Sequence, residues 1–179
     1  MTVYTIGHGN RAIEEFLGLL QGAAIECLVD VRAYPASRRH PQFSRDALEG
    51  SLAGAGVRYA WEGKSLGGRR KAAADSPHIA LRSPGFRAYA DYMTTEEFRA
   101  GLERLIERAA GDRVAIMCAE RLPWQCHRNL ISDSLAARGI GVRHLMDKGE
   151  IREHTLNPIA RQDGERLIYD AGEQLGLKL

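Results

Sequence analysis

Cysteine is scarce in this chain of 179 residues, which has three: Cys27, Cys118 and Cys126. An odd number of cysteines and the lack of a basic, then apolar, signal segment at the N-terminus argue against a disulfide framework. They predict a protein of the reducing cytoplasm. No apolar run approaches the roughly 20 residues that a membrane helix needs, so no membrane association is expected.

The chain also lacks a large excess of either charge, since its formal net charge is +2. A net charge this small is weak for general binding to nucleic acid. The exception is the glycine- and arginine-rich segment 62–87. It carries six basic residues against two acidic ones, a local excess of 6 − 2 = +4: Lys64, Arg69, Arg70, Lys71, Arg82 and Arg87 against Glu62 and Asp75. We expect a basic loop whose Gly67-Gly68-Arg69 turn closes over an anionic ligand; the alternative is a solvated, flexible loop.

The apolar pattern alternates between short runs and helical spacing. Strands are predicted over 3–6, 25–31, 57–61, 113–118 and 142–146, and helices over 13–20, 45–56, 86–93, 98–109 and 129–139. We expect Asn10 and Ser44 to cap the first two helices and Thr94 to form a capping box with Glu97. Residues 147–179 form a less regular tail, in which 165–170 is a candidate edge strand.

Strand followed by helix, repeated, is typical of right-handed βαβ units and a parallel sheet covered on both faces. The sequence therefore predicts one α/β domain over residues 1–179, a Rossmann-like three-layer fold with a mainly parallel sheet. Ligands of such folds bind at the carboxyl ends of the strands. His8 follows the first strand, Asp30, Arg32 and Ser37 lie at and after the second, and residues 118–128 follow the fourth. We expect these three loops to share one edge.

The last of these loops reads CAERLPWQCHR and has the densest chemistry. The triplet Cys126-His127-Arg128 precedes a predicted helix, where free N–H groups and the helix dipole favour negative charge. Cys126 is therefore expected to have a depressed pKa and to act as the nucleophile, with Cys118 a second choice. Glu120 is a candidate general acid or base if its surroundings are dry.

An anionic small molecule, a nucleotide or another phosphorylated compound, fits the remaining groups. Arg32 and Arg128 would hold the anion, and His8 or His127 would move a proton. The two cysteines and His127, with His8, could surround zinc, but seven residues between the cysteines match no short zinc motif, so no metal is predicted. The cofactor, the reaction and the oligomeric state are left open.

Two other functions remain open. A nucleic-acid-binding or repair-associated module would use the basic segment together with Arg38, Arg39 and His40, and stack bases on three aromatic residues: Tyr34, Trp61 and Trp124. A nucleotidyltransferase-like enzyme is suggested by TIGH at 5–8 and by the serine-containing run at 131–138.

Taken in order, five stretches resemble a bacterial family, domain of unknown function 488. They are TIGH, DVRAYPASRRHPQF, SLGGRR, MCAERLPWQCHRNLISDSL and VRHL. The resemblance covers nearly the whole chain and implies a Rossmann-like α/β domain without an assigned activity. The family's recurring residues match these positions of this sequence: His8, Asp30, Arg32, Pro35, Ser37, Phe43, Gly67, Gly68, Cys118, Glu120, Cys126, His127 and Arg128.

Overall fold

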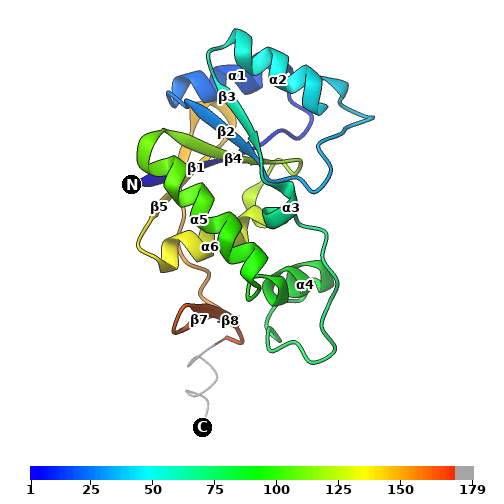
Figure 1. Ribbon diagram of the computed structural model, residues 1–179, viewed down its shortest axis with the longest axis vertical. Coiled ribbons are helices and arrows are strands. Elements are labelled where there is room, and N and C mark those ends of the chain that lie inside the picture. Colours follow the sequence, from blue (N-terminus) through cyan, green and yellow to red (C-terminus); the bar gives the residue numbers. More distant parts are fainter. Residues whose placement is uncertain (172–179) are drawn as a thin grey trace.

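The computed structural model describes residues 1–171 and has a six-stranded sheet at its centre (Figure 1). The strand order is β3-β2-β4-β1-β5-β6, and only β6 runs antiparallel to its neighbour. The strands are β1 (Thr2–Gly7), β2 (Cys27–Asp30), β3 (Arg58–Trp61), β4 (Val114–Cys118), β5 (Gly141–Leu145) and β6 (Ile151–Glu153). The predicted Rossmann-like three-layer α/β fold with a mainly parallel sheet is confirmed.

Helices cover both faces of this sheet. The helices are α1 (Ile13–Gly22), α2 (Arg45–Gly54), α3 (Gly63–Leu66), α4 (Pro84–Tyr92), α5 (Glu96–Gly111) and α6 (Arg128–Ala137), with single 3-10 turns η1 (Pro41–Phe43), η2 (Pro123–Gln125) and η3 (Asp147–Gly149). α1 and α2 pack on one face, and α4, α5 and α6 on the other. No helix within residues 1–171 has both the length and the apolar character that crossing a bilayer requires.

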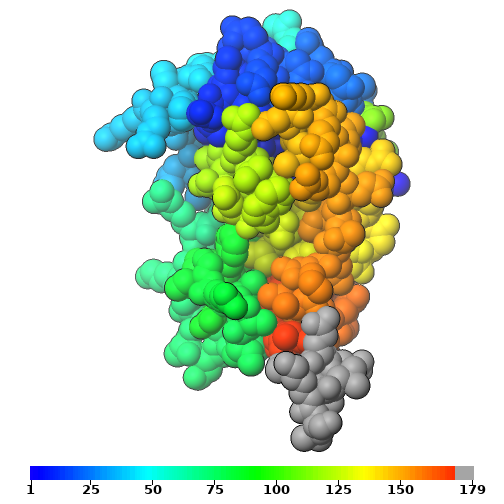
Figure 2. Space-filling view, turned by 180° about the vertical axis from the view of Figure 1, so that it is seen from behind, coloured from blue at the N-terminus to red at the C-terminus, as the bar shows by residue number. Residues whose placement is uncertain are grey.

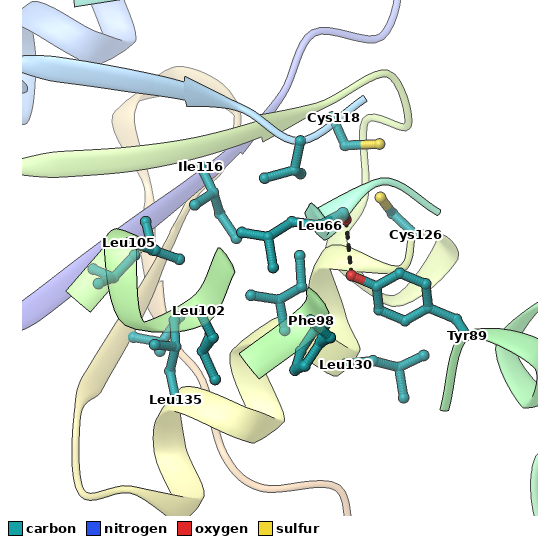
Figure 3. Packing of buried hydrophobic residues seen from close by; sticks show 14 of the residues in the cluster. Leu66, Tyr89, Phe98, Leu102, Leu105, Ile116, Cys118, Cys126, Leu130 and Leu135 are labelled. Atoms are coloured by element: carbon teal, nitrogen blue, oxygen red, sulfur yellow. Dashed lines mark hydrogen bonds between the residues drawn. The ribbon is translucent and has the colours of Figure 1, made fainter. Parts of the chain in front are cut away.

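β4 shows why the sheet is buried on both sides. All five of its residues are buried, and successive side chains of a strand point to opposite faces. Ala115 and Met117 belong to the apolar cluster under α1 and α2, whereas Val114 and Ile116 belong to the cluster under α5 and α6. Figure 3 shows Ile116 packed with leucines of this second cluster. A continuous apolar run is what such a two-sided core selects.

The helix starts differ from two of the sequence predictions. Thr95 caps α5 in place of Thr94, and its hydroxyl accepts a hydrogen bond from the Phe98 N–H at 3.3 Å. α1 begins at Ile13, too far along the chain for Asn10 to cap it; Asn10 instead accepts a hydrogen bond from Arg121 at 2.8 Å. The start of α5 differs from the prediction by one residue, because Thr94 and Thr95 are equivalent capping residues in the sequence.

The two segments expected to be irregular contain short elements. Segment 62–87 holds α3 and the start of α4, and the tail holds β6 and a hairpin of β7 (Ala160–Asp163) and β8 (Arg166–Tyr169). The expected strand at 165–170 is therefore a strand, but it pairs with β7 and not with the edge of the main sheet. The rest of the predicted tail, 172–179, lies outside the described residues.

A buried chain of polar groups joins the tail to the sheet. The Thr5 hydroxyl contacts His144 Nδ1 at 2.7 Å, and His144 Nε2 lies 3.0 Å from His154 Nδ1. His154 Nε2 donates to the Asp133 carboxylate at 3.0 Å, and the Tyr169 hydroxyl donates to its other oxygen at 2.9 Å. β1, β5, α6 and β8 are thus connected through one set of side chains.

His144 makes the stability of the fold depend on pH. Burial, and then the charges of His154 and Arg128, lower its pKa to about 3. Between about pH 6.5 and that value the unfolded chain takes up a proton that the folded protein excludes, so the free energy of unfolding falls as pH falls. We expect His144→Gln to flatten this dependence by up to about 1.4 kcal/mol per pH unit. Urea denaturation at a series of pH values measures both slopes, and parallel curves would contradict the assignment.

Candidate functional site

The loops after three parallel strands meet at one edge of the sheet. β1 and β4 are paired in register at their last residues, Gly7 and Cys118, and Asp30 at the end of β2 pairs with Met117. The backbone continues this contact, since the His8 N–H donates to the Cys118 carbonyl at 3.0 Å. Figure 2 shows the loop after β2, in light blue, projecting beside the yellow-green loop after β4.

These loops enclose an open cleft of about 730 Å³. Nine of the residues proposed from the sequence line it: His8, Arg32, Ser37, Gly68, Arg69, Cys118, Glu120, Cys126 and His127. Asp30, Gly67 and Arg128 do not line it. The structure therefore brings most of the predicted groups to a single concave surface at the carboxyl edge of the sheet, which is where ligands bind in open α/β folds.

Two cysteines and a histidine form a compact cluster on the wall of the cleft. The Cys118 and Cys126 sulfurs lie 3.7 Å and 3.6 Å from Nδ1 of His127. The other ring nitrogen of His127, Nε2, lies 3.1 Å from the Val31 carbonyl oxygen, which fixes the ring. Figure 3 shows the two cysteine side chains together at the upper edge of the packed apolar cluster. Cys118 is the last residue of β4, and Cys126 and His127 lie between η2 and α6.

The two thiols differ in acidity, and in the opposite sense from the sequence prediction. A hydrogen bond from Cys126 lowers the pKa of the Cys118 thiol well below its usual value, against the effect of burial and with help from His127 and Arg128. Burial, and then the adjacent Cys118 sulfur, raise the pKa of Cys126. The surroundings therefore favour the thiolate at Cys118 over the one expected at Cys126, because only one of two touching thiols can ionise easily.

Asp30 and Arg32 form a buried ion pair behind the cleft. Arg32 Nη2 lies 2.6 Å from an Asp30 oxygen, Arg32 Nε lies 2.9 Å from the other, and the Tyr59 hydroxyl also donates to Asp30, at 2.8 Å. Arg32 Nη1 donates to the Phe43 carbonyl at 2.8 Å. Both side chains are at most 5% exposed. Arg32 thus reaches the cleft with its nitrogens already engaged, and it shapes the wall of the cleft.

His8 is held as a neutral ring. It stacks on Phe43 with 4.4 Å between ring centres, its Nδ1 lies 2.9 Å from the Gly9 carbonyl, and its Nε2 faces Arg32 Nη1 at 3.5 Å. Burial, opposed by the hydrogen bond to Gly9, lowers its pKa to about 4. With Nδ1 donating to the carbonyl, Nε2 is the acceptor and is directed at an arginine. The predicted role of His8 in proton transfer would have to compete with that contact.

Arg128 lies inside the protein and does not line the cleft. Its side chain is fully buried and donates to the carbonyls of Glu120 and Arg121, both at 2.9 Å. It therefore fixes the backbone of the loop after β4 and cannot take the anion-binding role expected from the sequence. Within the described part of the chain, its Nε and Nη1 atoms have no hydrogen-bond partner.

The remaining predicted residues have different surroundings. Ser37 accepts a hydrogen bond from the His40 N–H at 3.0 Å and so shapes the loop after β2. Glu120 is exposed, so it lacks the dry surroundings that a general acid or base role requires. Gly68 lies against His127, since a Cβ at this position would be 2.5 Å from Nδ1. Only a glycine permits this approach, and the turn expected to act as a lid is packed on the histidine ring.

A family model described as Domain of unknown function DUF488 matches residues 12–135, more than half of the chain. The chain belongs to the DUF488 family. No curated protein and no solved structure was found to match. The matched range contains the cysteine–histidine cluster and the Asp30–Arg32 pair, whereas His8 precedes it. The resemblance inferred from the sequence is confirmed, and it identifies no activity.

Sequence reasoning assigned no site role to Arg121 and Phe86, which also line the cleft of this DUF488 protein. Arg39 and His40 line it too, although the sequence suggested them only for nucleic-acid binding. Arg121 sits within the CAERLPWQCHR loop itself and was missed because its neighbours carry more distinctive groups. Phe86 comes from α4, a helix distant in sequence, and nothing in the local pattern indicates that it reaches this edge of the sheet.

Proposed function

We propose that this DUF488 protein is an enzyme acting on an anionic small molecule, a nucleotide or another phosphorylated compound, bound in the cleft at the carboxyl edge of the sheet. One observation carries the proposal: the cleft combines basic side chains with the cysteine–histidine cluster. Four arginines and one glutamate line it: Arg32, Arg39, Arg69, Arg121 and Glu120. The cluster on its wall is where the reaction takes place.

Of these four arginines, Arg39 and Arg69 are the ones that bind the anion, because the other two already have carboxylate partners. Arg32 pairs with Asp30, and Arg121 pairs with Asp147. Within residues 1–171, Arg39 and Arg69 have no carboxylate partner; Arg69 lies over the Tyr34 ring at 5.6 Å. An unpaired guanidinium offers a bidentate fork for phosphate or carboxylate. Arg39 and Arg69 come from the loops after β2 and α3, so two separate segments of the chain can bind one ligand.

We expect Arg39→Ala and Arg69→Ala each to weaken binding of a phosphorylated ligand by about tenfold, since a hydrogen bond to a charged group contributes roughly 1.5–3 kcal/mol. Calorimetry with a panel of phosphate, pyrophosphate and mononucleotides measures the effect. Both residues are exposed, so the fold should be unchanged.

Arg38→Ala is the matched control, because Arg38 is exposed and adjacent to Arg39 but does not line the cleft. It removes the same charge from the same loop. Equal weakening by Arg38→Ala, or no binding of any panel member by the wild type, would contradict the proposal. Preference for an oligonucleotide over every mononucleotide would favour the nucleic-acid-binding alternative instead.

A further inference from the structure

The cysteine–histidine cluster has the dimensions of a metal site. All three candidate ligand atoms, Cys118 Sγ, Cys126 Sγ and His127 Nδ1, lie within 4.8 Å of one another. In a tetrahedral zinc site with bonds of about 2.3 Å to sulfur and about 2.1 Å to nitrogen, sulfur and nitrogen are roughly 3.6 Å apart. The two sulfur–nitrogen distances here are 3.7 Å and 3.6 Å. The side chains therefore already stand at ligand spacing.

The orientation of His127 is that of a ligand. The Val31 carbonyl oxygen can only accept a hydrogen bond, so the Nε2 atom 3.1 Å from it carries a proton. In the neutral ring Nδ1 then has the lone pair, and both sulfurs face it. One lone pair accepts a hydrogen bond from one thiol only, whereas one cation engages all three atoms. A ligating histidine that donates its second N–H to a carbonyl is the usual outer arrangement of protein metal sites.

Arg128 borders the cluster on the side of the protein interior. The Arg128 backbone N–H donates to Cys126 Sγ at 3.5 Å. The buried guanidinium of Arg128 acts electrostatically on both cysteines, and two of its nitrogens lack a hydrogen-bond partner among the described residues. A fixed guanidinium beside the two sulfurs balances the negative charge that two thiolate ligands bring to a metal site.

We propose that Cys118, Cys126 and His127 bind a zinc ion through three protein ligands, with the fourth coordination position facing the cleft. All three residues line the cleft. Two sulfurs and one nitrogen suit zinc and other soft divalent ions and do not suit magnesium or calcium. Three protein ligands plus an exchangeable one is the pattern of catalytic zinc sites, whereas structural sites use four.

The ligand spacing along the chain had argued against a metal. Seven residues separate the cysteines, and short zinc motifs use two to four. The structure removes that objection, because β4 ends at Cys118 and the η2 turn brings the chain back beside it at Cys126. The spacing rule applies to two ligands on one knuckle, and here the ligands come from a strand end and a helix start.

The zinc ion would also take part in the proposed function, and this part of the inference rests on that function. Its open position would take an oxygen of the anionic ligand that Arg39 and Arg69 hold in the cleft. Cys118 would then serve as a ligand, and the Lewis-acidic ion would be the reactive group. Metal binding itself does not require any cleft ligand, so the two claims can fail separately.

The test is titration of the full-length, chelator-treated protein with Co²⁺, a spectroscopic probe of tetrahedral thiolate sites, and with Zn²⁺ in competition. We expect one equivalent of Co²⁺ to bind with intense visible bands and a thiolate charge-transfer band, and Zn²⁺ to displace it. Cys118→Ser, Cys126→Ser and His127→Ala should each weaken binding by more than the roughly 100-fold that loss of an outer-shell partner costs.

Cys27→Ala is the matched control. Cys27 is buried like the other two cysteines but lies at the start of β2, outside the cluster. It should leave the stoichiometry and the spectrum unchanged. Circular dichroism of each variant shows whether metal binding is lost because the protein no longer folds. The cobalt spectrum of the wild-type protein tests the proposal without any variant. A metal-free pair of thiolate and imidazolium would give no cobalt–thiolate band. Absence of that band in the wild type overturns the proposal.

Inorganic phosphate added to the Co²⁺-loaded protein tests the open position. A shift of the visible bands is expected. If the cobalt bands form but do not shift with phosphate, the metal site stands and the proposed open coordination position is wrong. This holds whatever calorimetry shows for Arg39 and Arg69. Phosphate binding that depends on those arginines in a protein without any thiolate band would support the proposed function and overturn the zinc site.

Discussion

Asp133→Ala is expected to lower the free energy of unfolding by about 4 kcal/mol. The carboxylate is fully buried in α6 and accepts three hydrogen bonds, from His154 Nε2, the Asn157 N–H and the Tyr169 hydroxyl. Alanine leaves these three donors without their acceptor, and an unsatisfied buried donor costs about 1–3 kcal/mol. Urea denaturation followed by circular dichroism measures the loss.

The same substitution should release the C-terminal hairpin. Tyr169 anchors β8 to Asp133, and its carbonyl accepts the Ala80 N–H at 2.9 Å. Hydrogen exchange at Ala80 should therefore accelerate in Asp133→Ala more than exchange at the central strand β4, which this network does not hold. The basic segment and the tail are thus expected to open together.

Two variants decide whether hydrogen bonding is the cause. Asp133→Asn keeps an acceptor for His154 and Asn157, and its amide can donate to the Tyr169 oxygen, so it should recover much of the loss. Asp46→Ala makes the same change at an exposed position in the first turn of α2 and should cost no more than about 1 kcal/mol. An Asn variant as unstable as the Ala variant would refute this explanation.

The central architecture was predictable because it depends on local patterns. Short apolar runs and helical spacing indicated the strands, and the rule that parallel strands end at one edge brought His8, Arg32 and Cys118 together. Arg128 shows the limit. Its position after Cys126 suggested an anion contact, but its side chain turns inward to the Glu120 and Arg121 carbonyls, and no sequence pattern records that choice of rotamer.

The acidity of the cysteines and the polar network of the tail were not predictable for a related reason. Which thiol ionises depends on three-dimensional neighbours, and the pKa of Cys118 is lowered by Cys126, which is eight positions further along the chain but in contact with it in space. From the sequence, Asp133 was expected only to be one residue of an amphipathic helix. Its partners, His154 and Tyr169, come from a tail whose docking no periodicity indicates.

Asp30→Asn is expected to cost about 3–5 kcal/mol of stability, because it leaves the charge of Arg32 buried without its partner. Asp30 accepts hydrogen bonds from the Arg32 backbone N–H, from its guanidinium and from the Tyr59 hydroxyl. An asparagine amide turned toward these donors cannot accept from them. Chemical denaturation at neutral pH measures the change.

The exposed pair of Arg143 and Glu153, joined at 3.1 Å across β5 and β6, supplies the matched control. Glu153→Gln removes one carboxylate charge, as Asp30→Asn does, but water screens the remaining arginine. We expect a change of at most about 1 kcal/mol. Similar losses at both positions would show that burial of the Asp30–Arg32 pair does not set the cost.

The double variant Asp30→Leu with Arg32→Met should be more stable than Asp30→Asn, since no uncompensated charge is left and an apolar pair of similar volume often replaces a buried ion pair without loss. It also separates the anion-binding role that the sequence suggests for Arg32 from the buried ion pair with Asp30. The Nε and Nη2 atoms are bound to Asp30, and Nη1 is bound to the Phe43 carbonyl, so little of the guanidinium is left for a ligand. A stable double variant should therefore bind the phosphorylated ligand nearly as well as the wild type. A large loss of affinity in a protein of recovered stability would instead place Arg32 beside Arg39 and Arg69 as an anchor of the anion.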